Sequence, residues 1–273
     1  ETALGNRIFT DESSGLSLGI EICEDLWLPI TPSSHLALNG AQIILNPSAS
    51  DETVGKSDYR RSLVSVQSAK SICGYVYASA GVSESTTDLV FSGHHIIAES
   101  GAILAENERF ERESTITYAE IDYAKLRSDR TRGCNMAECN LAYSDRFLYT
   151  PVALEDLRTL DNAKDKLLRR YEKNPFVPSD PAATERICRE VFKIQTAGYA
   201  KRLEHTHAKK SVIGISGGLD STLALLAAAE THRLLGKALS DIIAVTMPGF
   251  GTTDKTYGNA LTIMKLLGTE VRE

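Results

Sequence analysis

The chain has 273 residues, of which 42% are hydrophobic and 24% charged, and its formal net charge at pH 7 is −6. This is ordinary globular composition, sufficient for a large core and for two domains. The acidic balance argues against a nucleic-acid partner, and no apolar run is long enough to span a bilayer. Five cysteines without the spacing of a disulfide framework or a zinc site favour a reduced protein of the cytoplasm.

Three short apolar runs in the first part of the chain are typical of buried strands. Two segments between them have helical spacing and stop at glycines. Helices that alternate with strands in this way predict a mixed sheet covered by helices. The strands are expected at residues 16–23, 41–48 (with a turn at Asn46-Pro47) and 75–81, and the helices at residues 34–40 and 58–74, ending at Gly40 and Gly74.

A hairpin and one further strand complete this first part. Residues 94–108 favour a hairpin around Ser100-Gly101, and residues 114–122 are typical of a last strand. His94 and His95 invite interpretation as a metal site. Because adjacent strand residues face opposite sides, we predict structural histidines instead.

The rest of the chain changes character twice. Residues 129–180 lack a regular spacing of apolar residues and include a proline-rich stretch, which indicates an inter-domain connection. A long helix then opens at Asp180 and Pro181. The pattern that follows predicts a βαβ unit with a parallel sheet. Its strands are expected at residues 211–216 and 241–248, its helix at residues 221–236, and one more helix at residues 257–268.

The string Ser-Gly-Gly-Leu-Asp-Ser-Thr lies between a buried strand and a helix. Adjacent glycines let a ligand approach the backbone, and the new helix supplies unpaired N–H groups and the positive end of its dipole. A carboxylate there can hold Mg²⁺ against phosphates. The alternative is a plain turn in which the Asp only caps the helix. The predicted nucleotide-binding residues are Ser216, Gly217, Gly218, Leu219, Asp220, Ser221 and Thr222, with Asp220 also predicted to bind Mg²⁺.

Cys23 ends an apolar run at a bend, which is where a nucleophile elbow places its side chain. Its neighbours Glu21, Glu24 and Asp25 disfavour a thiolate, and the first lysine of the chain is Lys56. We expect Glu24 and Asp25 to hydrogen-bond locally and to shape the bend. From these residues alone, a small buried strand cysteine is the favoured interpretation.

Two stretches resemble known enzymes. "GIEICEDLW" resembles the nucleophile strand of nitrilase-like amidases, and "GISGGLDST" resembles the pyrophosphate loop of enzymes that split ATP into AMP and pyrophosphate. With "NPFVP", "RLEHT" and "MPGFGT" they resemble one family, the glutamine-dependent NAD synthetases. The resemblance implies an α/β fold. It places the C-terminal part of a nitrilase-like αββα domain in residues 1–128, the connection in 129–180, and the start of a Rossmann-like parallel-sheet ATP-pyrophosphatase domain in 181–273.

The resemblance also implies the chemistry. Such a ligase amidates deamido-NAD to NAD with ATP and with ammonia from glutamine, and it releases AMP and pyrophosphate. Cys23 would be the nucleophile of the glutamine hydrolase, and Ser50 and Lys56 match positions that contact glutamine. ATP, Mg²⁺, deamido-NAD and glutamine are therefore implied. The full-length protein is expected to be a cytoplasmic homo-oligomer with small-molecule substrates and neither nucleic-acid nor membrane partners.

The family places a Glu and a Lys well before the cysteine, whereas 22 residues precede Cys23 here and none is Lys. We therefore expect an internal fragment, cut at both ends, that is inactive alone. Two alternatives stay open: another ATP-pyrophosphatase-type amidotransferase or thiolase, and a chain that binds ATP without turnover. Turnover assays on the chain and on the full-length protein would separate the enzymes from the last alternative.

Overall fold

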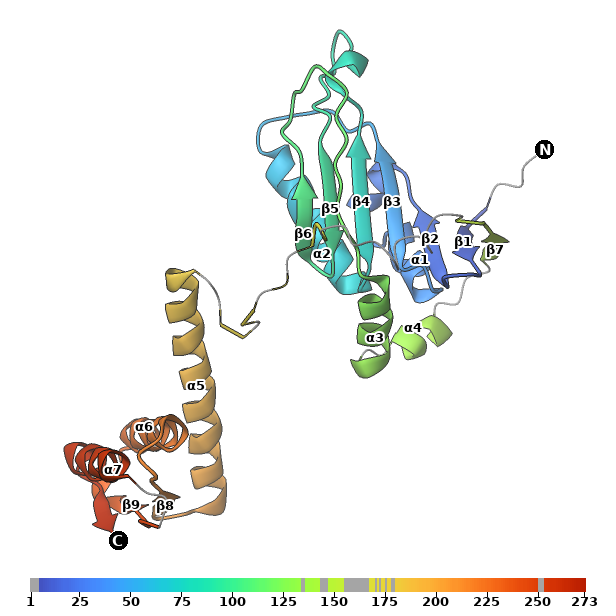
Figure 1. Cartoon of the computed structure of the whole chain (residues 1–273). Helices are drawn as coiled ribbons and strands as arrows, with labels where there is room; N and C mark the ends of the chain where they lie inside the picture. The colour runs from blue at the N-terminus through green and yellow to red at the C-terminus, as the bar shows by residue number, and fades with distance from the viewer. Residues whose placement is uncertain are drawn as a thin grey trace. The chain divides into compact units, whose positions relative to one another are not determined.

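A computed structural model describes residues 5–133, 136–142, 147–154, 167–169, 171, 173–174, 176–177, 180–249 and 253–273. The chain divides into two compact units, Glu1–Arg170 and Tyr171–Glu273, and each is described by itself (Figure 1). Across the described ranges, no helix is both long enough and apolar enough to cross a membrane.

A seven-stranded mixed sheet forms the first unit, in the order β6-β5-β4-β3-β2-β1-β7 (Figure 1). The pairs β2–β3, β3–β4 and β1–β7 are parallel, and the other neighbours are antiparallel. The parallel centre places the carboxyl ends of β2, β3 and β4 at one edge. The strands are β1 (Arg7–Asp11), β2 (Leu16–Ile20), β3 (Ile43–Ser48), β4 (Gly74–Ser79), β5 (His95–Glu99), β6 (Ala102–Glu106) and β7 (Leu148–Pro151).

Helices α1 (Pro32–Leu38) and α2 (Lys56–Ser71) pack on this sheet and on each other. Val64 of α2 and Ile44 of β3 are both buried in the core between the layers, together with the rings of Tyr75 and Tyr77. Both helices were predicted from their spacing. The smaller helical elements of the unit are η1 (Cys23–Trp27), η2 (Val82–Glu84), α3 (Tyr123–Gly133) and α4 (Met136–Ala142).

The predicted turn at Asn46-Pro47 is wrong, because β3 continues through both residues to Ser48. Pairing of β2 with β3 ends at Leu45, whereas pairing of β4 with β3 continues to Ser48. Beyond Leu45, β3 therefore pairs with β4 alone among the described strands. A proline is tolerated there because its missing N–H falls on an unpaired side.

The predicted end of the second helix also shifts. Helix α2 ends at Ser71, and Ile72 rather than Gly74 adopts the left-handed conformation that closes it. Gly74 instead starts β4. The hairpin around Ser100-Gly101 is confirmed by the antiparallel pairing of β5 with β6.

No strand forms at residues 114–122, where the sequence favoured one. The side chains of Ile116 and Tyr118 are 73% and 69% exposed. The alternation of apolar residues in this segment therefore faces solvent instead of a core, and an alternating pattern predicts a strand only where one face is buried.

The predicted connection contributes to the first unit. Its β7 pairs with β1, and α3 docks through Arg130, which donates to the backbone oxygens of Ala41, Ser71 and Ile72. Those oxygens lie where α1 and α2 give way to strands, so one guanidinium ties three segments together. The compact unit thus extends beyond residue 128, and the domain boundaries derived from the sequence stay a prediction.

The second unit is a three-stranded parallel sheet in the order β10-β9-β8, with helices packed on it. The long helix starts as predicted, because the Asp180 carboxylate accepts from the N–H groups of Ala182 and Ala183. Leu225 and Met264 are fully buried in its core. The elements are α5 (Pro181–Thr206), β8 (Ser211–Gly214), α6 (Leu219–Leu234), η4 (Leu239–Asp241), β9 (Ile242–Val245), α7 (Asp254–Leu267) and β10 (Glu270–Arg272).

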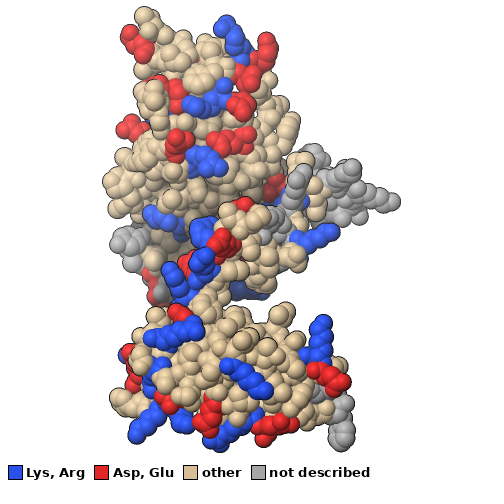
Figure 2. All heavy atoms as spheres, turned by 90° about the vertical axis from the view of Figure 1, so that its left-hand side faces the viewer, with Lys and Arg blue, Asp and Glu red and all other residues tan. Residues whose placement is uncertain are grey.

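The predicted α/β class is confirmed: a mixed sheet in the first unit and a parallel sheet in the second. Helix α6 begins two residues earlier than expected, so Asp220 lies inside its first turn. Charges of both signs are interspersed on the face drawn in Figure 2.

Candidate functional site

Cys23 occupies a strained turn at the carboxyl end of β2. Its φ angle is +50°, in the left-handed region that non-glycine residues rarely adopt. The turn leads from β2 into η1, and its thiol is half-buried. The predicted bend at Cys23 is therefore present, with the backbone strain expected of a nucleophile elbow.

Asn46 fixes this turn from the neighbouring strand. The Cys23 N–H donates to Asn46 Oδ1 at 3.1 Å, and Asn46 Nδ2 donates to Tyr75 Oη at 3.0 Å. Asn46 is itself buried. The side chain that the sequence assigned to a turn instead positions the candidate nucleophile from β3.

The acidic neighbours of Cys23 are each placed differently. Glu21 is buried, where its carboxylate accepts from the Tyr75 hydroxyl and from Ser33 N at 2.7 Å. Burial raises the pKa of Glu21, and the hydrogen bonds from Tyr75 and Ser33 only partly offset it.

Asp25 has a local structural role. Its Oδ2 accepts the Ile22 N–H at 2.7 Å, which confirms that Asp25 bonds locally and shapes the bend. Glu24 is exposed. Two of the three acids are therefore accounted for by the architecture of the turn.

Lys56 lies beside the same turn. It is the first residue of α2, and its Nζ lies 5.5 Å from the centroid of the Trp27 ring, at the end of the η1 helix that Cys23 begins. The ammonium also pairs with Asp51 Oδ1 at 2.6 Å. That hydrogen bond, together with the lysine charge, lowers the pKa of Asp51.

Ser50 is buried in the loop between β3 and α2. The structure thus places Ser50 in this loop and Lys56 directly after it, at the carboxyl edge of the sheet where Cys23 lies one strand away. Their contact with glutamine stays a prediction. Sequence reasoning missed Asn46 and Asp51; an Asn-Pro pair inside an apolar run, with no glycine nearby, was the available signal for Asn46.

The second candidate site is the loop that joins β8 to α6. Its bonds are long and lie among exposed groups: Ser216 Oγ lies 3.1 Å from Ser221 Oγ, and Gly218 N donates to Ser216 Oγ at 3.3 Å. Ser221 Oγ also donates to the Gly218 carbonyl at 3.2 Å. These hydroxyls bond only weakly within the loop, so they can turn to an incoming ligand.

The two glycines of this loop have different roles. Gly217 has φ +82°, and a Cβ there would lie 1.9 Å from the Thr256 carbonyl oxygen, so the fold itself requires glycine. At Gly218 the nearest atom to a Cβ would be Ser216 Oγ at 3.4 Å. Space above Gly218 is therefore open, as a phosphate cradle requires.

Asp220 is not the cap of α6. Gly218 occupies the N-cap position, no side chain caps the helix, and the Asp220 carboxylate lies exposed in the first turn. Helix N–H groups without a side-chain cap and a free carboxylate fit a phosphate chain with its divalent cation. Among the described residues, no three His, Cys, Asp or Glu side chains gather as a metal site. A cavity of about 540 Å³ also borders Asp220, lined by Tyr199, Ile213 and Leu223 among others.

The assignments of Leu219 and Thr222 to an ATP site stay predictions, as do those of the other loop residues. Leu219 is 89% exposed, so its side chain contributes little packing, and its backbone N–H is the group available to a ligand. Thr222 starts the regular helical bonding by donating its N–H to the Gly218 carbonyl.

Family models match each unit separately. A carbon-nitrogen hydrolase model matches residues 3–131, and an NAD synthase model matches residues 192–273. Similar proteins include the glutamine-dependent NAD(+) synthetases of Mycobacterium tuberculosis (strain ATCC 25618 / H37Rv), 40% identical over 265 residues, and Mycobacterium leprae (strain TN), 41% identical over 260 residues. Each alignment covers 95% of this chain and 38% of the relative, so the chain spans about two fifths of the relatives' length.

Solved structures were compared as well. The glutamine-dependent NAD+ synthetase from Acinetobacter baumannii, in complex with adenosine diphosphate, matches 100% of this chain and 40% of its own, with 18% identity and a TM-score of 0.40. The Nit3 protein of Saccharomyces cerevisiae, a nitrilase superfamily member, matches 42% of this chain and 40% of its own, with 26% identity and a TM-score of 0.36.

Proposed function

Because the chain belongs to the glutamine-dependent NAD(+) synthetase family, we propose that its first unit releases ammonia from glutamine and its second unit uses ATP to attach that ammonia to deamido-NAD. The overall reaction would form NAD, AMP, pyrophosphate and glutamate. The proposal follows the two family models and the mycobacterial relatives, which match both units in one alignment.

In the first unit, Cys23 would attack the side-chain amide carbon of glutamine. Its Sγ forms a thioester, the amide nitrogen leaves as ammonia, and water then releases glutamate. The hydrogen bond from Cys23 N–H to Asn46 holds the strained turn, so the thiol is positioned before substrate arrives. Ser50 and Lys56 would bind glutamine, with the Lys56 ammonium on its α-carboxylate.

In the second unit, the loop from Ser216 to Thr222 would bind the phosphates of ATP. The N–H groups at the start of α6 and the hydroxyls of Ser216 and Ser221 supply donors to the phosphate oxygens. Asp220 would hold Mg²⁺, which neutralises phosphate charge when bound. ATP would then adenylate the carboxylate of deamido-NAD, and ammonia would displace AMP.

One observation carries the proposal: two sites occur in one chain. The first is a cysteine in a strained turn whose backbone N–H is bound by a buried asparagine, and the second is an open glycine loop at the start of a helix. Either site alone would fit several reaction types. A glutamine hydrolase joined to an ATP-splitting loop fits an amidotransferase.

The test separates the two sites. In the full-length gene product, Cys23→Ala should lower glutamine-driven NAD formation at least about 1,000-fold, because the nucleophile is lost. Formation driven by ammonium salt should stay near the wild-type rate. Cys188→Ala, at an exposed cysteine of α5, is the matched control and should change neither rate. Equal loss of both activities in Cys23→Ala would refute the assignment.

We also propose a cytoplasmic location and small-molecule substrates, from the metabolic chemistry above and from five cysteines without a disulfide framework. A homo-oligomeric state is proposed for the full-length gene product. Fractionation of cells and light scattering of the purified protein test these two points.

A further inference from the structure

The loop between β3 and α2 positions both residues that we assign to glutamine. Ser50 lies near its start, and Lys56 follows its end. The loop is bonded to its surroundings at Glu52, whose N–H donates to the Val90 carbonyl at 2.7 Å. Glu52 also carries the loop's most buried charge.

Glu52 anchors the loop through a buried ion pair with α2. Its Oε2 lies 3.1 Å from Arg60 Nη1, and the two side chains are 6% and 0% exposed. The Ser92 hydroxyl donates to the same Oε2, and Arg109 Nη1 lies 3.3 Å from Oε1. Burial would raise the pKa of Glu52, but the hydrogen bonds from Ser92 and Arg60 outweigh it and lower the pKa. The carboxylate is therefore held in its charged form.

Arg60 is in turn fixed from behind. Its Nη1 lies 2.9 Å from His94 Nδ1, and the guanidinium carbon lies 5.7 Å from the centroid of Tyr77. An arginine N–H can only donate, so His94 Nδ1 must be the acceptor and Nε2 must carry the hydrogen. That hydrogen points at Glu106 Oε1, 2.8 Å away.

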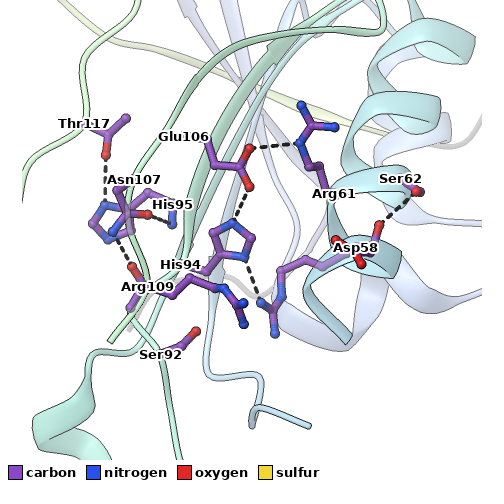
Figure 3. Close-up of polar contacts among 12 residues, drawn as sticks. Asp58, Arg61, Ser62, Ser92, His94, His95, Glu106, Asn107, Arg109 and Thr117 are labelled. Atoms are coloured by element: carbon purple, nitrogen blue, oxygen red, sulfur yellow. Dashed lines mark hydrogen bonds and ion pairs between the residues drawn. The ribbon is translucent and has the colours of Figure 1, made fainter. Parts of the chain in front are cut away.

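Glu106 completes the chain of contacts. Figure 3 shows its carboxylate between His94 and Arg61, whose Nε donates at 2.9 Å. The His95 ring turns the other way, with Nδ1 3.3 Å from Thr117 Oγ1, while the backbone N–H of His95 donates to Asn107 Oδ1. The predicted opposite orientation of the two histidines is therefore present. His94 acts as a neutral spacer between two charged groups, since burial lowers its pKa.

We propose that Glu52 is a positioning residue for glutamine: through its ion pair with Arg60 it holds the loop of residues 49–55, and hence Ser50 and Lys56, in the conformation that binds substrate. The inference rests on the proposed function for the assignment of Ser50 and Lys56. A buried ion pair adds little net stability, because removing two charges from water costs free energy. It is favourable only when the two groups lie in a narrow range of positions, and it therefore restricts the conformation of the loop.

Glu99 offers a matched control. It is also a buried carboxylate, 3% exposed, and is paired with Arg169 at 2.6 Å. It ends β5 opposite Gly74, which starts β4, so it lies at the other end of these strands from Ser79 and His95. Glu99→Gln therefore removes an equally buried charge far from the loop.

The experiment uses the full-length gene product and two readouts. Hydrogen exchange of the peptide containing residues 49–56 reports loop order directly. Protection of Cys23 from iodoacetamide by L-glutamine, followed by mass spectrometry of the Cys23 peptide, reports substrate binding. Arg109→Gln, which removes only the less buried partner of Glu52, is a second variant in case Glu52→Gln folds poorly.

Glu52→Gln should speed exchange in residues 49–56 and weaken glutamine protection at least about tenfold, because the buried Arg60 charge loses its carboxylate partner. The unprotected alkylation rate of Cys23 should change less than about twofold, since the Asn46 contact is untouched. Arg109→Gln should act in the same direction with smaller size, and Glu99→Gln should leave both readouts unchanged.

Unchanged exchange in both Glu52→Gln and Arg109→Gln, or an equal effect of Glu99→Gln on the loop, would overturn the inference. Absence of glutamine protection in the wild type would instead overturn the proposed glutamine site. Loop exchange would still decide in that case whether Glu52 anchors the loop.

Discussion

The two units hold their candidate sites in opposite ways. Around Cys23, buried side chains fix a strained turn: Asn46 binds its backbone N–H, and Tyr75 and Glu21 bind one another next to Asn46. In the second unit the loop of residues 216–222 is mostly exposed, and its hydroxyls bond to each other at 3.1 Å or more. The first site is built from side chains in the core, whereas the second is built from backbone and open space.

The proposed substrates explain this difference. A glutamine amide is small and neutral, so the protein must place the nucleophile before binding, and that requires fixed partners. A triphosphate brings several charges and many acceptor oxygens, so a loop with unpaired N–H groups and mobile hydroxyls can form its bonds on binding. The comparison can be tested from both sides.

The largest effect is expected at Asp220. Asp220→Asn should lower ATP–pyrophosphate exchange in the full-length gene product at least about 100-fold, because an amide holds Mg²⁺ much more weakly than a carboxylate. Asp241→Asn, which precedes β9 at the opposite end of the sheet, is the matched control. Exchange near the wild-type rate in Asp220→Asn would mean that this carboxylate does not serve the phosphates.

The next largest effect separates the two glycines. Gly217→Ala should lower the free energy of unfolding of the second unit by about 2–4 kcal/mol, because the new methyl collides with Thr256 and φ is positive. Hydrogen exchange of residues 211–216 measures it. Gly218→Ala should leave exchange nearly unchanged and weaken ATP binding instead.

An internal control comes with these variants. Trp27 is the only tryptophan of the chain and lies in the first unit, so its fluorescence reports the unfolding of that unit. The urea concentration at the midpoint of this transition should be the same in both glycine variants as in the wild type. Equal destabilisation by the two alanines would contradict the distinction between a structural and a ligand-facing glycine.

A smaller effect is expected at Asn46. Asn46→Ala should lower the free energy of unfolding of the first unit by about 2 kcal/mol, because the buried Tyr75 hydroxyl and Cys23 N–H each lose a partner. Trp27 fluorescence in urea measures it. Asn39→Ala, which loses one bond to His35 at a half-buried helix end, should cost clearly less.

The smallest effect depends on pH. A carboxyl whose pKa is raised by burial, as in Glu21, stabilises the fold while it is protonated, and that contribution is lost as pH rises through the raised pKa. Glu21→Gln cannot ionise. Its free energy of unfolding relative to wild type, measured by urea unfolding, should therefore improve as pH rises from the ordinary glutamate pKa through the raised one.

Asp11 supplies the opposite slope. Hydrogen bonds from Ser13 and Ser14 lower its pKa, so its stabilisation is present above its ordinary pKa and is lost as pH falls through the lowered value. The loss of unfolding free energy caused by Asp11→Asn should therefore become smaller as pH falls. A flat pH profile for the difference between Glu21→Gln and wild type would contradict the raised pKa of Glu21.

Elements with buried faces could be predicted from the sequence. The strands that became β2, β3, β4, β8 and β9 are short apolar runs, and α2 and α5 have clear helical spacing or capping residues. The strands that were missed, β1, β7 and β10, pair through backbone bonds while much of their surface is half-buried or exposed. Strands with so little buried apolar surface carry little hydrophobic pattern to detect.

The candidate sites were predictable in their local parts only. Cys23 at a bend and Gly217 before a helix are local features, and the structure contains both. Partners supplied by other segments, such as Asn46 from β3, depend on strand order and register. The local sequence around a residue does not specify which strand will pair beside it in the sheet.

The position of β7 has a consequence for the order in which the protein folds during synthesis. Arg7 donates to Thr150 at 3.1 Å across 143 residues of chain, and among the described strands it is β7 that pairs with β1 on that side. On the ribosome, β2 to β6 can pair while β1 still presents an open edge. Contacts so distant in sequence form late and leave such edges prone to wrong pairing. A slowed ribosome between residues 106 and 148 would therefore lengthen the period in which β1 presents an open edge.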